Sequence, residues 1–481
     1  MLERQSATEL SRLLASRNLS AVELSQHFLD RVERVDKSIQ SFLTVNPESV
    51  IKQARIAQER LDTGQAHPIC GLPVAFKDNI STFGLRTTCG SKLLEGYVPE
   101  FNATVTDRIS DAGGVIFGKT NLDEFAMGTS TEHSAFHPTR NPWDTSRSPG
   151  GSSGGSAACV AASMAPLSLG SDTGGSIRQP AALCGIVGFK PTYGRCSRYG
   201  LVAFGSSLDQ IGPFGKTVED AALLTSAITG HDGRDSTSLR TGPVSADFDR
   251  ATLKGKRLGI PKELCGPEVN SEVREAFEEA VKRLEAEGAQ VTEISLPALK
   301  LAVTTYYIIA PAEASSNLAR FDGVRYGTRV DSATHIEMME RTRARGFGHE
   351  VKQRILVGTY VLSAGYYDAY YQRAQQVRAL MRSQILSAFD SFDFILSPTS
   401  PVPAFKLGEL RDDPIALKLL DLCTIPANMA GLPAISVPCG LANGLPVGLQ
   451  IMGQPMDDEG VLEVAYATER VVDRVSLPEL V

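Results

Sequence analysis

Two clusters rich in glycine and serine are the parts of this chain best suited to chemistry. They are residues 149–156, PGGSSGGS, and residues 170–176, GSDTGGS. Glycine tolerates positive φ and close approach of a substrate, so the run 173–176 can point several backbone N–H groups in one direction. A hydroxyl among such donors, here Ser176, has the geometry that acyl transfer requires. We therefore expect an oxyanion hole beside a serine nucleophile.

The surroundings of the two clusters argue against flexible linkers. Sequence rich in Gly and Ser usually forms linkers. Here, however, the Ala-rich run 157–165 lies between the clusters and predicts a short buried helix. Linkers do not normally alternate with core-forming sequence. Both loops are therefore expected on one compact scaffold.

Lys77 follows a short apolar run, LPVAF at 72–76, which predicts a strand. No charged run surrounds this lysine, as one would on a solvated face. Lysine rarely becomes buried without a reason. From this segment alone, Lys77 is either a surface residue at the end of a strand or a buried functional amine.

Residues 113–120 match the GxxxxGK[ST] pattern of a nucleotide-binding P-loop. That motif needs a strand before its first glycine and a flexible, phosphate-binding loop after it. In this chain the expected strand, VIF at 115–117, occupies the loop positions. We therefore do not expect ATP to bind at this segment.

Residues 151–155 match the GxSxG nucleophile elbow, with Ser153 as the nucleophile and His349 available to complete a Ser, Asp, His order. The elbow requires a buried strand that runs into it. The preceding segment 141–149, NPWDTSRSP, is polar and broken by prolines. This alternative stays open, but the missing strand disfavours it.

Composition and charge describe a folded protein without a strongly basic surface. The 481 residues are 42% hydrophobic and 21% charged, with a net charge of −7, so tight direct binding to nucleic acid is not expected.

The eight cysteines form no CxxC pair and indicate reduced thiols of a cytosolic protein. The N-terminus lacks the pattern of a signal or transit peptide, and no apolar run approaches the ~20 residues of a membrane span. We expect a cytoplasmic protein that does not associate with membranes.

Alternating strand and helix patterns predict an α/β fold. Capping boxes at Ser6 and Ser20 begin helices in the region 1–60, which we expect to be helical. The polar segment of roughly 230–255 is expected to be a surface connection. Further strands are expected at 184–189, 257–260, 291–294, 392–398, 433–438 and 447–451. Because both halves supply strands and no clean linker separates them, we expect one domain over 1–481, with one large mixed, mostly parallel sheet covered by helices on both faces.

Three separated motifs resemble the amidase signature family. They are Phe76-Lys77-Asp78, the cluster 150–156, and the segment 172–178, DTGGSIR, in the order that the family shows. Within the family, the wider chain is similar to the ammonia-producing subunits of tRNA-dependent amidotransferases. The similarity covers nearly the whole chain and includes the segments 123–128, 313–317 and 365–371.

This resemblance implies a Ser, cis-Ser, Lys triad, related to the Ser-Lys variants of serine hydrolases. Ser176 would be the nucleophile, Ser152 would relay its proton, and neutral Lys77 would be the base. The oxyanion would be held by the main-chain N–H groups of Thr173, Gly174, Gly175 and Ser176. The resemblance also implies a cis peptide before Ser152.

The implied base places a physical demand on Lys77. An ordinary lysine, with a pKa of ~10.4, is neutral in only about 1 of 2500 molecules at pH 7. Lowering the pKa requires burial or a neighbouring positive charge. Lys77 should therefore be buried.

The same resemblance implies glutamine as the amide donor. Arg354 would pair with its α-carboxylate, Asp421 would pair with its α-ammonium group, and Tyr307 would line the pocket. An arginine suits a carboxylate because its guanidinium can donate two parallel hydrogen bonds.

Partners are also implied by the resemblance. This chain would hold no cofactor and would form a heterotrimer with amidotransferase subunits B and C. A partner subunit would use ATP and Mg²⁺ to activate misacylated Glu-tRNA(Gln) or Asp-tRNA(Asn), and ammonia from this chain would complete the amide. The tRNA would be held mainly by the partner.

Two other functions remain open at this point. A stand-alone amidase that acts on aryl or aliphatic amides would use the same triad with an apolar pocket. A non-catalytic assembly subunit would need none of Lys77, Ser152 and Ser176, so the presence of all three argues against it.

Overall fold

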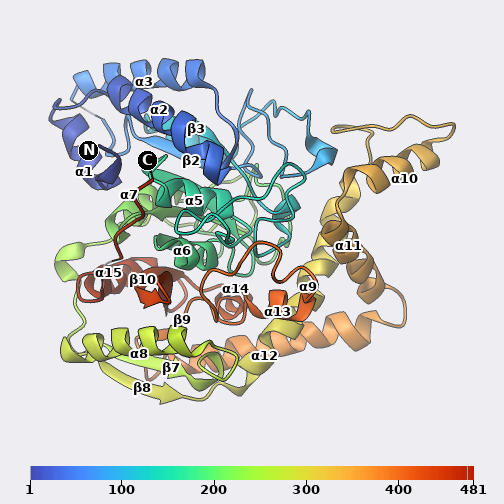
Figure 1. Cartoon of the computed structure of the whole chain (residues 1–481). Helices are drawn as coiled ribbons and strands as arrows, with labels where there is room; N and C mark the ends of the chain where they lie inside the picture. The colour runs from blue at the N-terminus through green and yellow to red at the C-terminus, as the bar shows by residue number, and fades with distance from the viewer. Residues whose placement is uncertain (1, 65, 474, 481) are drawn as a thin grey trace.

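The computed structural model describes residues 2–64, 66–473 and 475–480 and builds them around one extended sheet (Figure 1). Its eleven described strands run in the order β1-β3-β2-β4-β6-β5-β10-β11-β9-β7-β8. Their bounds are β1 Phe42–Thr44, β2 Pro73–Lys77, β3 Val115–Thr120, β4 Leu167–Asp172, β5 Val187–Lys190, β6 Gln210–Gly215, β7 Arg257–Pro261, β8 Gln290–Ile294, β9 Phe394–Pro398, β10 Ala434–Ala442 and β11 Leu445–Met452.

The sheet is mixed, as predicted, but it is not mostly parallel. Among the described strands, four of the ten neighbouring pairs are parallel, namely β2–β3, β2–β4, β7–β8 and β7–β9, and six are antiparallel. Part of the antiparallel centre is the hairpin of β10 and β11. At its turn, Asn443 and Gly444 have φ values of 51° and 78°, as a tight two-residue hairpin requires. The prediction of a mostly parallel sheet overlooked this Asn-Gly signal.

Fifteen α-helices of the described chain pack around this sheet. Their bounds are α1 Ala7–Ala15, α2 Ala21–Ile39, α3 Pro47–Asp62, α4 Thr104–Asp111, α5 Gly154–Ala161, α6 Arg178–Cys184, α7 Val218–Ile228, α8 Ser271–Ala286, α9 Ala302–Asn317, α10 His335–Gly346, α11 His349–Leu362, α12 Arg373–Ala388, α13 Pro414–Leu419, α14 Ile425–Ala430 and α15 Asp458–Glu469. Short 3₁₀ turns include η3 Glu124–Ala126, and a π-helical turn, η8 Tyr367–Gln372, precedes α12.

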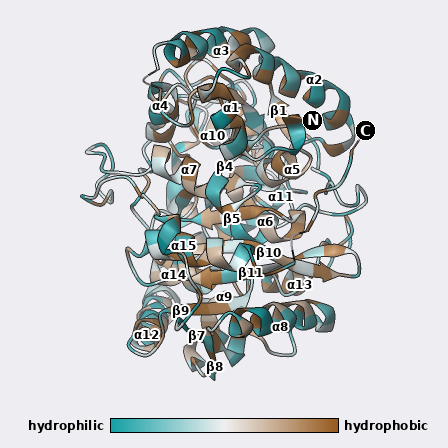
Figure 2. Cartoon of the chain, turned by 90° about the vertical axis from the view of Figure 1, so that its left-hand side faces the viewer, coloured by the Kyte–Doolittle hydropathy of each residue, from teal (hydrophilic) through white to brown (hydrophobic). Residues whose placement is uncertain are grey.

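Helices cover both faces of the sheet, as predicted. Successive strand residues point to opposite faces, and β9 shows the division. Phe394 and Leu396 pack in a core with α7, α8 and α15, whereas Ile395 between them packs in a second core with α9, α12 and α14. A third core lies between α1–α5 and the strands β2, β3, β4 and β6. In Figure 2 the central strands are largely hydrophobic, and the outer helices α2, α3 and α8 carry hydrophilic faces.

Local sequence explains where several helices begin and why one of them is buried. Both capping boxes are present: Ser6 and Ser20 accept from the N–H groups of Glu9 and Glu23, whose side chains accept in return. Between α2 and α3 the short strand β1 pairs with β3, an element that the sequence analysis did not anticipate. Every residue of α5 is buried, as the Ala-rich run predicted, because small side chains let this helix lie close to β2 and β4.

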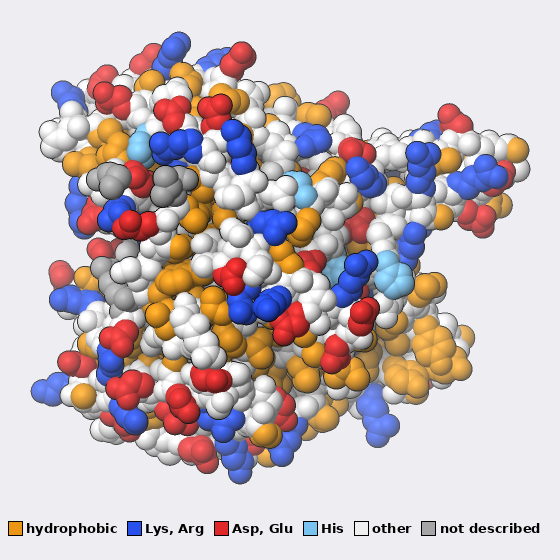
Figure 3. Space-filling view, viewed as in Figure 1, with side chains coloured by type: hydrophobic (Ala, Val, Ile, Leu, Met, Phe, Trp, Pro, Cys, Tyr) orange, Lys and Arg blue, Asp and Glu red, His pale blue; other side chains and the backbone are white. Residues whose placement is uncertain are grey.

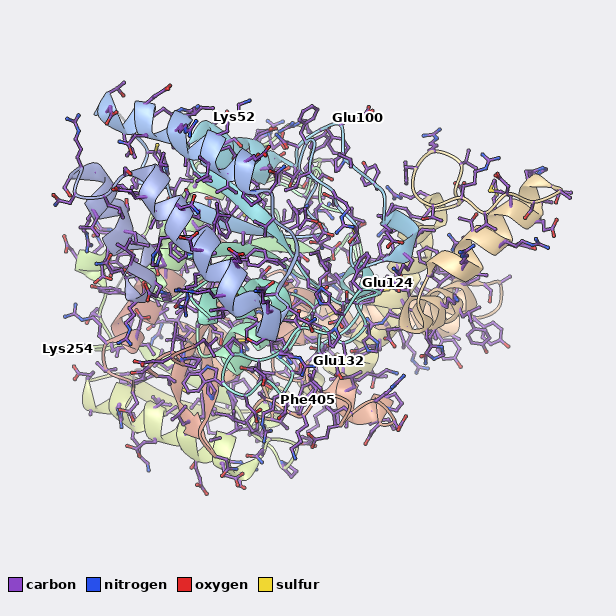
Figure 4. The ribbon with its side chains drawn as sticks, turned by 45° about the horizontal axis from the view of Figure 1, so that its top comes forward. Lys52, Glu100, Glu124, Glu132, Lys254 and Phe405 are labelled. Atoms are coloured by element: carbon purple, nitrogen blue, oxygen red, sulfur yellow. The ribbon has the colours of Figure 1, made fainter. Side chains whose placement is uncertain are left out.

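One part of the chain protrudes from the main body (Figure 1). This arm, residues 321–348, consists of a loop followed by α10. It joins the main body near Glu124, which is labelled in Figure 4 and whose carboxylate accepts from Gly348 N at 2.8 Å. Helix α11 follows the arm, and it connects this exposed region to the interior.

Helix α11 has two different faces. Val351, Arg354, Gly358 and Val361 are buried. Its outward residues and the π-helical turn beside it leave large hydrophobic side chains exposed, and these belong to the hydrophobic cluster at the lower right of Figure 3: Leu356, Val357, Tyr360, Tyr366, Tyr367 and Tyr370. The buried face of α11, which includes Arg354, and the exposed aromatic surface therefore lie on opposite sides of the same helix.

The two ends of the described chain lie together, since Arg4 and Glu479 form an ion pair. All eight cysteines, each within the described residues, are unpaired. Among the described helices we find none with the length and hydrophobicity to cross a membrane.

Candidate active site

Lys77 is the last residue of β2, a strand that lies between β3 and β4 and is buried along its whole length. The Lys77 side chain has no exposed surface. Its Nζ lies 2.8 Å from Ser152 Oγ, 3.0 Å from Ser171 Oγ and 3.3 Å from the Ser171 carbonyl oxygen. Of the two interpretations of Lys77, the structure therefore supports the buried amine.

Burial lowers the pKa of Lys77 from its ordinary value to about 7. The carboxylates of Asp123, Asp172 and Asp209 act in the opposite direction and do not outweigh burial. With a pKa of about 7, about half of the molecules carry a neutral amine at pH 7, against about 1 in 2500 for an exposed lysine. The neutral amine has a free electron pair and can accept a proton.

The peptide bond between Gly151 and Ser152 is cis, as the resemblance implied. Gln179 Oε1 accepts from Gly151 N at 3.0 Å, and the Ser152 carbonyl accepts from Asp123 N at 3.3 Å. A Cβ on Gly151 would lie 2.3 Å from Asp123 Oδ2, so only glycine fits here. These contacts hold the fully buried Ser152 side chain against Lys77.

The second glycine-rich loop connects β4 to α6. Among the described residues, the backbone N–H groups of Thr173, Gly174, Gly175 and Ser176 donate no hydrogen bond. Gly175 has a φ of 144°, a conformation that favours glycine. Four consecutive donors are thus available to a ligand in a buried loop, which is the arrangement that an oxyanion hole needs.

Ser176 closes this loop and is 7% exposed. Its hydroxyl makes no hydrogen bond to another described side chain or backbone group, whereas its carbonyl accepts from Ser153 N at 3.2 Å. The structure therefore joins Lys77 to Ser152 directly and brings the backbone of Ser176 next to the Ser152-Ser153 segment. The Ser176 hydroxyl remains available to a substrate.

A buried ion pair clamps the two ends of the loop. Asp172 Oδ1 and Oδ2 each accept from the Arg178 guanidinium at 3.0 Å, and Oδ2 also accepts from Ile177 N. Although burial acts to raise the pKa of Asp172, Arg178 beside it holds that pKa below its ordinary value. Because both ends are fixed by charge-assisted hydrogen bonds, the donors between them keep a defined geometry.

Tyr307, Arg354 and Asp421 are brought together, although they come from α9, α11 and the turn after α13. Tyr307 donates to Asp421 Oδ2 at 3.2 Å, and the Arg354 guanidinium lies 5.3 Å from the centre of the Tyr307 ring. Arg354 also donates to Glu350 Oε1 at 2.7 Å. All three are buried or half-buried, so a small polar ligand here would meet one guanidinium group and one carboxyl group.

Burial and neighbouring charge set the ionisation of this second group. Burial raises the pKa of Asp421 to about 8, although Arg354 and Tyr307 act to lower it. Burial acts to lower the pKa of Arg354, but Glu350, Tyr307 and Tyr306 together outweigh burial and raise that pKa. Asp421 is therefore protonated in most molecules at pH 7 until a cation approaches it.

Two motif matches from the sequence have structural explanations. The P-loop pattern at 113–120 overlaps β3. Its lysine, Lys119, is buried: Nζ lies 3.4 Å from Asp78 Oδ1 and donates to Thr87 Oγ1 at 2.7 Å. Lys119 therefore stabilises the protein interior through these polar contacts. Ser153, the candidate nucleophile of the GxSxG pattern, donates to the Ser171 carbonyl at 3.1 Å. No strand among the described residues precedes the 151–155 segment directly.

Several supporting residues escaped the sequence analysis. Asp123 accepts from the N–H groups of Ser130, Thr131 and His133. Asp209 accepts from the Thr173 hydroxyl at 2.6 Å, and the Thr424 hydroxyl contacts the same loop. Asp123 lies in the segment 123–128, whose similarity to relatives was a usable signal. Asp209 and Thr424 meet the loop only through the fold, and no local pattern distinguishes them.

Comparison with known proteins identifies the class. The model of the amidase family matches residues 23–462. The chain therefore belongs to the amidase family, and its large α/β sheet is the fold of that family.

Particular relatives narrow the position within the family. The chain is 55% identical over 468 residues to the A subunit of glutamyl-tRNA(Gln) amidotransferase from Carboxydothermus hydrogenoformans, covering 97% of this chain and 96% of the relative. It is 54% identical over 468 residues to the protein of the same name in Synechococcus sp. (strain JA-3-3Ab), covering 96% and 91%. The crystal structure of the Thermotoga maritima protein of that name matches with a TM-score of 0.82 and 44% identity, over 100% of this chain and 99% of the other.

Proposed function

We propose that this chain hydrolyses the side-chain amide of glutamine and supplies the ammonia to a tRNA-dependent amidotransferase, as its A subunit. The observation that carries the proposal is the hydrogen bond between a buried amine of lowered pKa, Lys77, and Ser152, beside a loop of free N–H donors that ends at Ser176. The relatives that share about half of the chain's residues carry the corresponding name.

In this proposal Ser176 Oγ attacks the γ-carbonyl carbon of glutamine. Its proton passes to Ser152, whose own proton passes to the neutral amine of Lys77. Negative charge develops on the carbonyl oxygen, where the N–H groups of residues 173–176 stabilise it. The C–N bond then breaks, ammonia leaves with a proton returned along the same route, and a γ-glutamyl ester remains on Ser176. Water, activated by the same residues, hydrolyses the ester to glutamate.

Selection of glutamine is proposed to rest on Tyr307, Arg354 and Asp421. The guanidinium of Arg354 suits the α-carboxylate, and the carboxylate of Asp421 suits the α-ammonium group. Glutamine would supply a carboxylate to Arg354, and its α-ammonium group would favour the ionised form of Asp421, whereas a neutral amide would do neither. These residues would therefore favour a free α-amino acid over a neutral amide. A stand-alone hydrolase of aryl or aliphatic amides has no use for such a pair.

The assembly is part of the proposal. Subunits B and C would complete a heterotrimer, and the partner would bind the misacylated tRNA and use ATP and Mg²⁺. The net charge of −7 suits a subunit that leaves most tRNA contacts to its partner. A single amidase domain over 1–481 belongs to the same proposal, and the continuous sheet and the family match over 23–462 support it. A cytoplasmic location is also part of the proposal.

One comparison tests the proposed function. Glutamate release from glutamine is measured for the wild type and for Ser176→Ala, each alone and with co-purified partner subunits. The proposal expects activity in the wild-type complex, together with formation of Gln-tRNA or Asn-tRNA, and loss of both in the variant. Undiminished glutamate release by Ser176→Ala would overturn it.

A further inference from the structure

Thr424 directly precedes α14 and lies far in sequence from the glycine-rich loops, yet it contacts the oxyanion loop. Its side chain is fully buried. The hydroxyl donates to the Gly174 carbonyl oxygen at 2.6 Å. No other described donor reaches that carbonyl, so this hydrogen bond alone fixes its direction.

The hydroxyl proton of Thr424 has one strong acceptor. A second oxygen, the Asp421 carbonyl, lies 3.2 Å from Oγ1. That carbonyl already accepts from the N–H groups of Thr424 and Ile425, at 3.2 and 3.0 Å. The proton therefore goes to Gly174, which is both closer and otherwise unpaired.

The orientation of the Gly174 carbonyl determines the orientation of a neighbouring donor. In a trans peptide the C=O and N–H bonds of one unit point in opposite directions, and the only cis peptide among the described residues is at Gly151-Ser152. Because Thr424 holds the Gly174 carbonyl, the N–H of Gly175 points away from Thr424. That N–H is one of the unpaired donors of the loop, so its direction is set by a residue of the C-terminal half.

Thr424 is itself held firmly. Arg178 donates to the Thr424 carbonyl at 2.9 Å, and Arg178 is the residue that pairs with Asp172 at the base of the loop. A Cβ on Gly175 would lie 2.2 Å from Thr424 Oγ1, so the Thr424 side chain packs against the Gly175 backbone as closely as a glycine allows. Neither the loop nor Thr424 can shift without breaking a buried hydrogen bond.

We propose that Thr424 is a positioning residue: by holding the Gly174 carbonyl, its hydroxyl aims the Gly175 N–H at the oxyanion. The turn 421–424 thereby links the oxyanion loop to Asp421, which is proposed to bind the α-ammonium group. The inference rests on the proposed function, because it assigns a role within that reaction.

The test compares Thr424→Val, which keeps the shape and removes the hydroxyl, with Thr424→Ser, which keeps the hydroxyl. We expect Thr424→Val to lower kcat for glutamine hydrolysis about 10- to 100-fold, somewhat less than the 10²–10³ lost when an oxyanion donor is deleted, with KM within about twofold. Thr424→Ser should recover most of kcat. A boronic acid analogue with boron in place of the amide carbon, which forms a tetrahedral adduct with a serine, should lose affinity for Thr424→Val by the same factor as kcat/KM.

Thr225→Val is the matched control. Thr225 is also fully buried, and its hydroxyl donates to the Ala221 carbonyl at 2.7 Å within α7. Thr225→Val should lose thermal stability to about the same extent as Thr424→Val but keep the wild-type kcat. If Thr424→Val does not fold, Thr424→Ala carries the same comparison.

Two results would overturn the inference: a folded Thr424→Val with wild-type kcat and boronate affinity, or a Thr424→Ser as impaired as Thr424→Val. Failure of the proposed function has a different signature, since Ser176→Ala would then keep its activity. An inactive Ser176→Ala together with a fully active Thr424→Val removes only the role of Thr424.

Discussion

The amine nitrogen of Lys77 lies 2.8 Å from the hydroxyl oxygen of Ser152, and neither side chain has exposed surface. Two further contacts of the amine go to Ser171. When the amine is neutral, its two N–H bonds can be donated to Ser171, and its electron pair then faces the Ser152 hydroxyl. The arrangement suits a base that acts through Ser152.

The first prediction concerns pH. Because the protonated amine has no electron pair to accept a proton, kcat at saturating glutamine, where Asp421 is already ionised, should fall as pH decreases through about 7, the pKa of Lys77, and should level off above it. Initial rates in overlapping buffers measure this profile. Lys77→Met should lose about 10²–10⁴-fold, as expected for a general base, and should lose the pH dependence near 7. A wild-type profile that is flat across this pH would contradict the role of Lys77.

The second prediction separates two adjacent serines. Ser152→Ala should lose nearly all glutamine hydrolysis, because it interrupts the route from Ser176 to Lys77. Ser153→Ala removes a hydrogen bond to the Ser171 carbonyl, which contributes about 0.5–1.5 kcal/mol, and it should lower kcat by less than about tenfold. Steady-state rates and melting temperatures of both variants decide this. The reverse order of effects would favour the nucleophile elbow instead.

The third prediction concerns substrate selection. Arg354→Ala should lower kcat/KM for glutamine about 30-fold or more, since truncating one member of a buried charge pair costs about 2–5 kcal/mol. Hydrolysis of a neutral aliphatic amide should change little, because that substrate has no α-carboxylate.

Arg343→Ala is a suitable control for this comparison. Arg343 is half-buried and donates to the carbonyls of Leu318 and Phe321 at the base of the arm. Its loss should affect stability and leave the preference between the two substrates unchanged. Equal losses for glutamine and the neutral amide in Arg354→Ala would argue against α-carboxylate binding.

The fourth prediction is a proton release on binding. Burial holds the pKa of Asp421 at about 8, so most molecules carry the neutral acid at pH 7. The α-ammonium group of glutamine favours the charged carboxylate, and binding should therefore release nearly one proton at pH 7 and much less at a pH above 9. Calorimetry of glutamine binding to Ser176→Ala, in buffers of different ionisation enthalpy, measures this number. No release at pH 7 would place the α-ammonium group away from Asp421.

Local sequence patterns predicted the parts of the site that lie close together in the chain. The glycine-rich clusters, the strand ending at Lys77 and the capping boxes at Ser6 and Ser20 depend on short-range rules, which the structure obeys. Resemblance to the family added the cis peptide before Ser152 and drew attention to Tyr307, Arg354 and Asp421. The structure brings these three together, but their role in glutamine binding stays a prediction.

Contacts between segments that lie far apart in the chain could not be predicted from the sequence. Thr424 reaches Gly174, and Asp209 reaches Thr173, only because the strand order places distant segments side by side. The prediction of a mostly parallel sheet was also wrong. The Asn443-Gly444 turn was a local signal that was overlooked, whereas the antiparallel pairing of β5 with β10 depends on tertiary packing. Spacing along the chain contains little information about such contacts.

Formation of an acyl-enzyme on Ser176 can be observed directly by mass spectrometry of the wild-type complex quenched with acid during glutamine hydrolysis. We expect the peptide containing Ser176 to gain the mass of one glutamyl group, and fragmentation to place that group on Ser176. The adduct should be absent from Ser176→Ala. An adduct on Ser153, or on a cysteine, in an actively hydrolysing enzyme would contradict the assignment of Ser176 as the nucleophile.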